Sequence, residues 1–261
     1  MHDVAALEAA LEGTMFAGKL HFAAVTGSTS TDALEAARDG APHGAVFLAD
    51  AQSAGRGRGD HRWQSDAGVG LYVSVLLRLP LTAERVQLLP LAAGLAAAGS
   101  IHAVSGLAAD LRWPNDVLLG ERKAGGILVE SRLTGNALDY AVVGIGINVH
   151  QCAFGADLTT PATSLDLAAG RRVSREALLV ALLESLEREA LATLADDAGK
   201  TIPARLCAAS TWVRGRRVDV HGPQACTGTT AGLDEQGFLL VETDGGIVTV
   251  RTGGIREAKA G

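Results

Sequence analysis

Apolar and polar positions follow two different periods along the first 80 residues. Residues 19–26 (KLHFAAVT) and 44–50 (GAVFLAD) are short apolar runs, and each predicts a strand. Between them, residues 28–40 (STSTDALEAARDG) place hydroxyl and carboxylate groups before a helical pattern and Gly40 after it. Residues 70–80 predict a further strand that ends at Pro80. Strands followed by helices are typical of a mixed α and β fold.

After Pro80 the pattern becomes helical and then extended again. Residues 82–104, rich in alanine and leucine, predict a helix that Pro90 bends or interrupts. Residues 110–120, 123–133 and 136–149 predict strands with tight connections, as in an antiparallel meander. Residues 174–194 carry leucines at spacings of three and four behind Ser174, which predicts a capped helix.

From Trp212 onward only short strands are predicted, separated by glycine and aspartate turns. This change predicts a second, small β-barrel unit. We therefore expect an α+β chain with a larger domain over residues 1–211 and a small barrel domain over residues 212–261.

Composition narrows the classes of function. Hydrophobic residues make up 48% of the 261 residues, and the net charge of −6 gives no overall field that attracts nucleic acid or an anionic membrane. The three cysteines are far apart and form no disulfide framework or zinc motif. The first residues do not have the pattern of a signal peptide, and no run of about 18 uninterrupted apolar residues occurs. We expect a cytoplasmic protein without nucleic-acid or membrane partners.

Positive charge is concentrated in one long connection, residues 49–71 (ADAQSAGRGRGDHRWQSDAGVGL). Its glycines allow backbone N–H groups to approach a ligand closely, and its arginines offer paired donors for phosphate or carboxylate. A solvated turn or an RNA-binding tract of arginine and glycine are the alternatives. A single passage between strands in an acidic protein favours a small anionic ligand.

Three shorter segments carry further candidates. In VVGIGIN, strand alternation places Gly144, Gly146 and Asn148 on one face, which indicates a close neighbour or, alternatively, a bulge. Asn115 and Asp116 of RWPND are polar groups at a strand end, or simply a turn. A solvated hairpin lysine is the ordinary explanation for Lys123.

Several nucleophile and metal motifs are missing from the sequence. No G-x-S-x-G, H-E-x-x-H or G-x-G-x-x-G pattern occurs, and the P-loop-like LADDAGKT has Leu194 in place of the first glycine. We expect neither a covalent enzyme nucleophile nor a metal held by the protein.

The motifs GSTS, QSAGRGRGDHRW, RWPND, KAGGILVE and VVGIGINV, taken in this order, resemble those of the biotin protein ligases. The resemblance covers about Leu20 to Val149 and continues more weakly over the last fifty or so residues. It implies a mixed sheet related to class II aminoacyl-tRNA synthetases and shared with lipoate ligases, followed by a barrel of the SH3 type.

The resemblance also implies the site residues. Lys123 and Arg58 are the implied catalytic pair. The implied biotin-binding residues are Ser28, Thr29, Ser30, Gln52, Gly55, Arg56, Gly57, Arg58, Lys123, Gly125, Gly126, Gly144 and Gly146. The implied nucleotide-binding residues are Arg58, Trp63, Asn115, Asp116, Lys123 and Asn148.

The chain departs from the family pattern at three places. Ser30 replaces the usual Asn, Arg112 replaces the usual Lys, and DHRW stands where a Gly-Arg pair is commoner. About twenty residues precede the first strand, so we expect the form without a DNA-binding domain and no repressor role.

The implied activity has two steps. Biotin and ATP, with Mg²⁺ bound to the ATP, give biotinyl-5′-AMP, and the biotinyl group then passes to a lysine of a biotin carboxyl carrier protein. The alternatives are a lipoate or other acyl-carboxylate ligase and, outside enzymes, a binding module. We expect a monomer or a weak homodimer.

Overall fold

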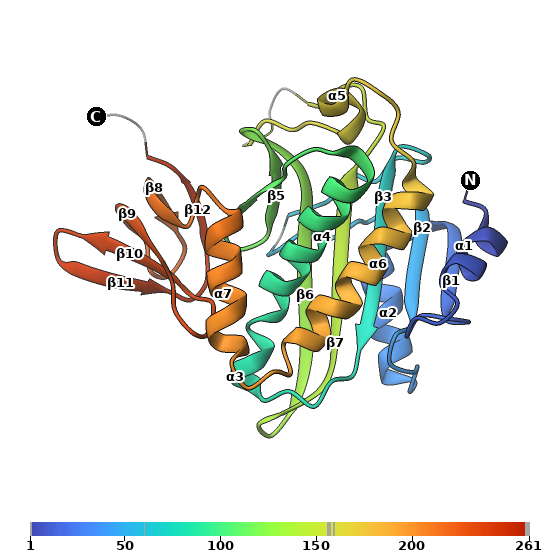
Figure 1. Ribbon diagram of the computed structural model, residues 1–261, viewed down its shortest axis with the longest axis horizontal. Coiled ribbons are helices and arrows are strands. Elements are labelled where there is room, and N and C mark those ends of the chain that lie inside the picture. Colours follow the sequence, from blue (N-terminus) through green and yellow to red (C-terminus); the bar gives the residue numbers. More distant parts are fainter. Residues whose placement is uncertain (1, 60, 156–157, 159, 259–261) are drawn as a thin grey trace.

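The computed structural model describes residues 2–59, 61–155, 158 and 160–258. A seven-stranded mixed sheet and a five-stranded antiparallel sheet form its two parts (Figure 1). The elements of the first part are α1 (Val4–Ala10), β1 (Leu20–Thr26), α2 (Thr29–Arg38), β2 (Val46–Gln52), β3 (Gly70–Leu77), α3 (Ala83–Val86), α4 (Leu89–Ser105), β4 (Asp110–Arg112), β5 (Asp116–Leu119), β6 (Arg122–Thr134), β7 (Ala137–Asn148), α5 (Leu165–Ala169), α6 (Arg175–Ala192) and α7 (Ala198–Ala209). The elements of the second are β8 (Arg214–His221), β9 (Cys226–Leu233), β10 (Leu239–Thr243), β11 (Gly246–Val250) and β12 (Gly254–Glu257).

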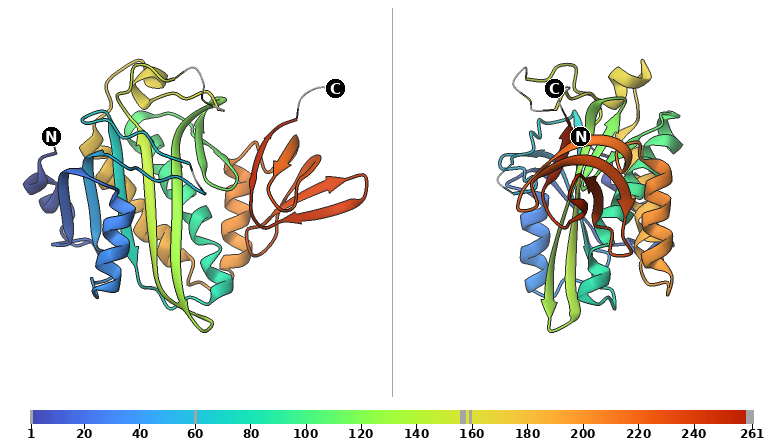
Figure 2. Two further views of the ribbon diagram at one scale, coloured as in Figure 1. Left: turned by 180° about the vertical axis from the view of Figure 1, so that it is seen from behind. Right: turned by 90° about the vertical axis from the view of Figure 1, so that its left-hand side faces the viewer.

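The large sheet has the strand order β1-β2-β3-β7-β6-β5-β4, with β1 and β2 parallel and the other neighbours antiparallel. Strands β4 to β7 therefore form the predicted meander. Helices α4 and α6 cover one face, and α2 covers the other (Figures 1 and 2). Strand β3 is buried along its whole length because both of its faces are covered, which explains its continuous apolar run.

Alternate residues of the central strands belong to two cores. Val75 and Val143 join the large cluster under α4 and α6. Leu76 and Val142 join a small cluster with Ala33 of α2 on the opposite face. Small alanines on α2 let this short helix lie close to the sheet, so the hydroxyl groups at its N-terminus reach Ser74 in the middle of β3.

The predicted helices and strands are present, and three further elements occur that the sequence did not predict. Pro90 stands in the first turn of α4, so the predicted helix over 82–104 is divided into α3 and α4. The Ser174 side chain accepts the N–H of Ala177, as predicted for an N-cap. Helices α5 and α7 and strand β12 were not predicted; α7 contains Pro203, which the pattern marks as a helix breaker.

One helical stretch, Ala83–Ser105, is long and apolar enough to cross a membrane. The sequence pattern did not indicate it, because polar residues interrupt its apolar run. Within its most apolar window 56% of the residues are buried, and α4 packs against the large sheet beside α6. This burial is that of a core helix.

The second sheet has the order β11-β10-β9-β8-β12 and is antiparallel throughout, consistent with the predicted SH3-like fold. It lies beyond α7, at the β4 side of the large sheet (Figures 1 and 2). The predicted domain boundary at residue 212 falls in the link between α7 and β8, and it stays a prediction.

Candidate active site

A cavity of about 960 Å³, called here the main cavity, opens between the ends of the central strands, the 53–69 connection and the second sheet. Its walls include most of the predicted site residues: Ser28, Thr29, Ser30, Gln52, Arg56, Gly57, Arg58, Trp63, Asn115, Asp116, Lys123, Gly126, Gly144, Gly146 and Asn148. The volume is at the upper end of the usual range for ligand sites, roughly 300–1,000 Å³.

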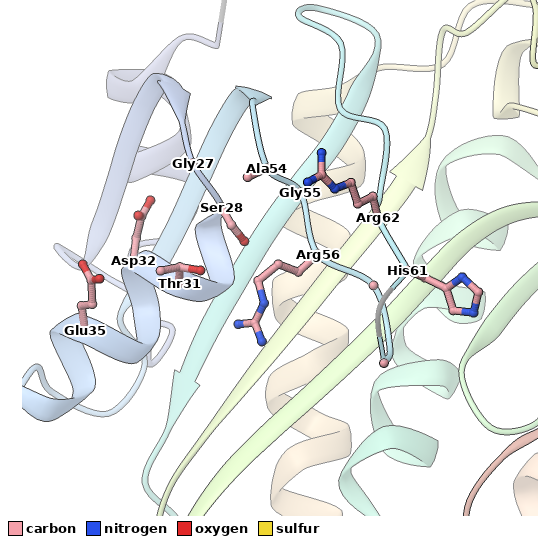
Figure 3. Close-up of a pocket in the computed structure, with 12 residues that line it drawn as sticks. Gly27, Ser28, Thr31, Asp32, Glu35, Ala54, Gly55, Arg56, His61 and Arg62 are labelled. Atoms are coloured by element: carbon pink, nitrogen blue, oxygen red, sulfur yellow. The ribbon is translucent and has the colours of Figure 1, made fainter. Parts of the chain in front are cut away.

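Two predicted residues lie elsewhere. Gly125 alternates with Gly126 along β6, so a Cβ on Gly125 would face Val117 and Ile147 of the core. Gly55 lines a second cavity of about 480 Å³, called here the side cavity. Figure 3 shows the side cavity between α2, which carries Asp32 and Glu35, and the connection that carries Arg56 and Arg62.

The floor of the main cavity is a pair of facing glycines. Gly126 of β6 is opposite Gly146 of β7, and the Trp63 indole lies against both. A Cβ on Gly146 would be 2.6 Å from the indole nitrogen, and one on Gly126 would be 3.1 Å from the ring. Glycine at these positions therefore makes room for a flat aromatic group, which favours the predicted close neighbour over a bulge.

Asp116, one of the residues predicted to bind the nucleotide, pairs with two cations. It pairs with the Lys123 ammonium group and accepts the Arg112 Nε proton over 3.1 Å. Arg112 also donates to the Thr160 hydroxyl over 2.9 Å, and Lys123 lies 5.5 Å from the centre of the Trp63 ring. The arrangement leaves a net positive wall against which an anion would be stabilised.

Asn115 and Asn148 use their amides within the protein. The Asn115 side chain donates to the carbonyl of Ile127, and that of Asn148 to the carbonyl of Thr163. Both amides therefore hold the cavity walls together, whatever further contact they make with a ligand.

The arginine-rich connection folds back on itself in the manner of a hairpin. Gly57 donates its N–H to the His61 carbonyl over 2.8 Å, and Trp63 donates to Gly55 over 2.9 Å. Arg56 forms a bidentate pair with Glu130 of β6, at 2.9 and 2.6 Å. The connection is thus anchored to the large sheet by one of its arginines.

Arg58 reaches the second sheet instead. Its guanidinium donates to the Thr252 hydroxyl over 2.8 Å and to the carbonyl of Gly253, and burial lowers the pKa of the group. An arginine remains protonated in any protein environment, so among the described residues this partly buried charge is held by neutral oxygens.

A network of hydroxyl groups closes the other end of the main cavity. Gln52 accepts the backbone N–H of Thr29 over 2.9 Å and donates to Ser65 over 2.7 Å. The Ser28 hydroxyl is buried and has no hydrogen-bond partner among the described residues. A buried polar group without a partner is costly, so Ser28 is available to a polar ligand.

Sequence reasoning missed part of the wall. Ser74, Tyr72, Phe154, Thr160, Thr252 and Arg256 also line the main cavity. Ser74 had a detectable signal, because it is the one polar side chain apart from Tyr72 in the buried run of β3. The contribution of the second sheet could not be found from local patterns, since it depends on how two units pack.

No group of three or more histidine, cysteine, aspartate or glutamate side chains is placed to hold a metal ion within the described part of the chain. The expectation that the protein itself holds no metal is based on missing sequence motifs, and it stays a prediction.

Known families and proteins resemble this chain in sequence and fold. Residues 22–148 match the model of the biotin/lipoate A/B protein ligase family, and residues 214–255 match that of the biotin protein ligase C-terminal domain. The bifunctional ligase/repressor BirA of Bacillus spizizenii is 34% identical over 85% of this chain and 69% of its own length. The biotin-[acetyl-CoA-carboxylase] ligase of Mycobacterium tuberculosis is 34% identical over 91% of this chain and 88% of its own.

Among solved structures, the biotin protein ligase of Aquifex aeolicus in complex with biotin and ATP superposes with a TM-score of 0.78. It is 28% identical, and the match covers 92% of this chain and 100% of the other.

Proposed function

This chain belongs to the biotin/lipoate A/B protein ligase family and acts as a biotin protein ligase, and we propose that both of its reaction steps take place in the main cavity. In the first step a biotin carboxylate oxygen attacks the α-phosphorus of ATP, which gives biotinyl-5′-AMP and pyrophosphate. In the second, the amine of a carrier-protein lysine attacks the acyl carbon and AMP leaves. Neither step needs an enzyme nucleophile, so orientation and charge neutralisation are the main requirements.

Lys123 and Arg58 are the groups proposed to neutralise charge at the biotin carboxylate and the α-phosphate. The observation that carries this proposal is that both line one cavity together with the Gly126–Gly146 floor. Arg58 is held by neutral oxygens of Thr252 and Gly253. A phosphate or carboxylate is a stronger partner for a guanidinium, so ligand binding would draw Arg58 from the second sheet.

The connection between β2 and β3 would close over the adenylate while Arg56 stays paired with Glu130. Closure would keep water from the mixed anhydride, which otherwise hydrolyses. Trp63 would supply an aromatic face for the adenine.

Magnesium would enter with ATP. Asp66 and Asp116 are the carboxylates among the described residues of the main-cavity wall, and Asp116 already pairs with Lys123 and Arg112. The phosphate oxygens and water would therefore supply most ligands of the ion, with Asp116 beside it.

The acceptor proposed is a lysine of a biotin carboxyl carrier protein, and a cytoplasmic location is expected for such a reaction. Lipoate is the competing substrate within the family. Adenylation assays with biotin and lipoate side by side separate the two.

Two substitutions test the assignment. Lys123→Ala or Arg58→Ala should slow biotin-dependent pyrophosphate release by about 100- to 1,000-fold, because each removes a preorganised charge worth about 3–4 kcal/mol of barrier. Lys200→Ala on α7 and Arg132→Ala at the far end of β6 are the matched controls and should react at the rate of the unsubstituted chain. Unchanged rates in both site variants would remove the assignment.

The complete reaction is tested with labelled biotin, ATP and a carrier domain. Label should appear on the carrier and should be absent when the acceptor lysine is replaced. Labelling that ignores the lysine would contradict the proposed second step.

A further inference from the structure

Ser74 occupies a position that the proposed chemistry does not use. It lies in the middle of β3, is fully buried, and is opposite Gly144 of β7. Its Oγ is 2.8 Å from the Thr29 hydroxyl and 3.0 Å from the Ser30 hydroxyl, both at the start of α2. Three hydroxyl groups are thus joined in a row at the wall of the main cavity.

The direction of each proton in this row follows from counting donors. The Thr29 backbone N–H can only donate, so Gln52 presents its Oε1 there, at 2.9 Å, and its Nε2 to Ser65. Oε1 has only lone pairs, and therefore the Thr29 hydroxyl also donates to it, at 3.2 Å. Since Thr29 has one hydroxyl proton, Ser74 must donate to Thr29, and Ser30 must donate to Ser74.

The row leaves Ser30 with an accepting face. Its single proton is directed inward to Ser74, so the lone pairs of Ser30 Oγ remain for the cavity. Gly144 is required for this placement, because a Cβ there would lie 2.5 Å from Ser30 Oγ. A hydroxyl that accepts but does not donate, as Ser30 does here, binds a ligand with N–H groups and is left unpaired beside a ligand without them.

We infer that Ser74 is a positioning residue for substrate specificity, which orients the Thr29 and Ser30 hydroxyls so that the wall accepts the ureido N–H groups of biotin. The dithiolane ring of lipoate has no N–H group and gains nothing from the same wall. This inference rests on the proposed binding of biotin in the main cavity.

The experiment compares ligands that differ only in these donors. Calorimetry measures the affinity of the unsubstituted chain and of Ser74→Ala for biotin and for an analogue in which both ureido N–H groups are CH₂ groups. Loss of Ser74 frees the Ser30 proton, which can then point at the ligand. Biotin binding should weaken by about tenfold or more while analogue binding changes less than about twofold. Ser100→Ala, which removes a buried hydroxyl on α4, is the control and should leave both affinities unchanged.

A purely structural role gives a different result. If Ser74→Ala weakens biotin and the analogue by the same factor, or changes neither, the inference is overturned. Should Ser74→Ala fail to fold, Ser30→Ala removes the acceptor itself and must lower the biotin-to-analogue affinity ratio in the same direction. Failure of the unsubstituted chain to bind biotin would instead overturn the proposed function.

Discussion

At the scale of single residues, the site depends on glycines whose missing side chains make room for an aromatic ring. Gly126 and Gly146 face each other across β6 and β7 and provide a surface without side chains. The Trp63 indole lies on this surface, with the Lys123 ammonium group 5.5 Å from the ring centre. A cation near an aromatic face is attracted to it, so the floor also orients Lys123.

Gly146→Ala should push the indole from the floor, because the new methyl group would be 2.6 Å from it. The strand remains intact, so we expect the KM for ATP to rise about tenfold, equivalent to about 1.4 kcal/mol, with little change in melting temperature. Gly126→Ala leaves 3.1 Å and should have a smaller effect. Steady-state kinetics of the two variants would contradict this explanation if Gly126→Ala were the more damaging.

At the scale of elements, a histidine fixes the end of β3 to the link between α2 and β2. The backbone N–H of Arg78 donates to His43 Nδ1 over 3.0 Å, which requires a neutral ring. Burial, and then the nearby Lys19 charge, lower the pKa of His43 below its ordinary value of 6.5. The folded state therefore binds the proton less readily than the unfolded chain does.

Stability should fall as the pH decreases through about 6.5, since the unfolded chain takes up the proton first. His43→Asn keeps an acceptor oxygen and does not titrate. Melting temperatures at pH 7.5 and 5.5 should therefore differ less in this variant than in the unsubstituted chain. An equal difference in both proteins would show that His43 does not contribute; the buried His2, whose pKa is also lowered, is present in each.

Element patterns predicted most of the fold, and the reasons for the failures are physical. The meander, the capped helix α6 and the glycine face of β7 each depend on local period, which the sequence displays directly. Helix α7 contains Pro203 and is stabilised by packing that a local pattern does not contain. The family motif led to the prediction of both Gly125 and Gly126 as site residues. Side chains alternate along a strand, and only Gly126 faces the cavity.

At the scale of the whole molecule, the second sheet completes the main cavity. Trp212, in the link between the two parts, is 3% exposed and lies under the guanidinium groups of Arg112 and Arg216, at 5.1 and 3.9 Å from its ring centre. Arg216 in turn pairs with Glu121 of the large-sheet part and Glu257 of β12. The Arg112–Asp116–Lys123 cluster and the second sheet are therefore physically continuous. The monomer or weak homodimer expected from the sequence stays a prediction.

Thr252→Val should loosen the contact between the arginine-rich connection and the second sheet. It removes the hydroxyl that Arg58 reaches at 2.8 Å while it keeps the side-chain size. We expect trypsin to cut the connection about ten times faster or more, because a charged hydrogen bond of this type contributes about 1.5 kcal/mol or more. Thr249→Val on β11 is the control, and equal cleavage rates in the two variants would contradict a role for this contact.

The walls of the main cavity come from α2, whose first turn includes Thr29, and from β12, which includes Arg256. During translation α2 leaves the ribosome early and β12 leaves it last, because the chain emerges N-terminus first. A nascent chain that has made the large sheet but not the link from β11 to β12 and β12 itself lacks Thr252, Gly253 and Arg256, which form part of the cavity wall. Competence to consume ATP should therefore arrive late in translation, after the last strand of the second sheet has left the exit tunnel.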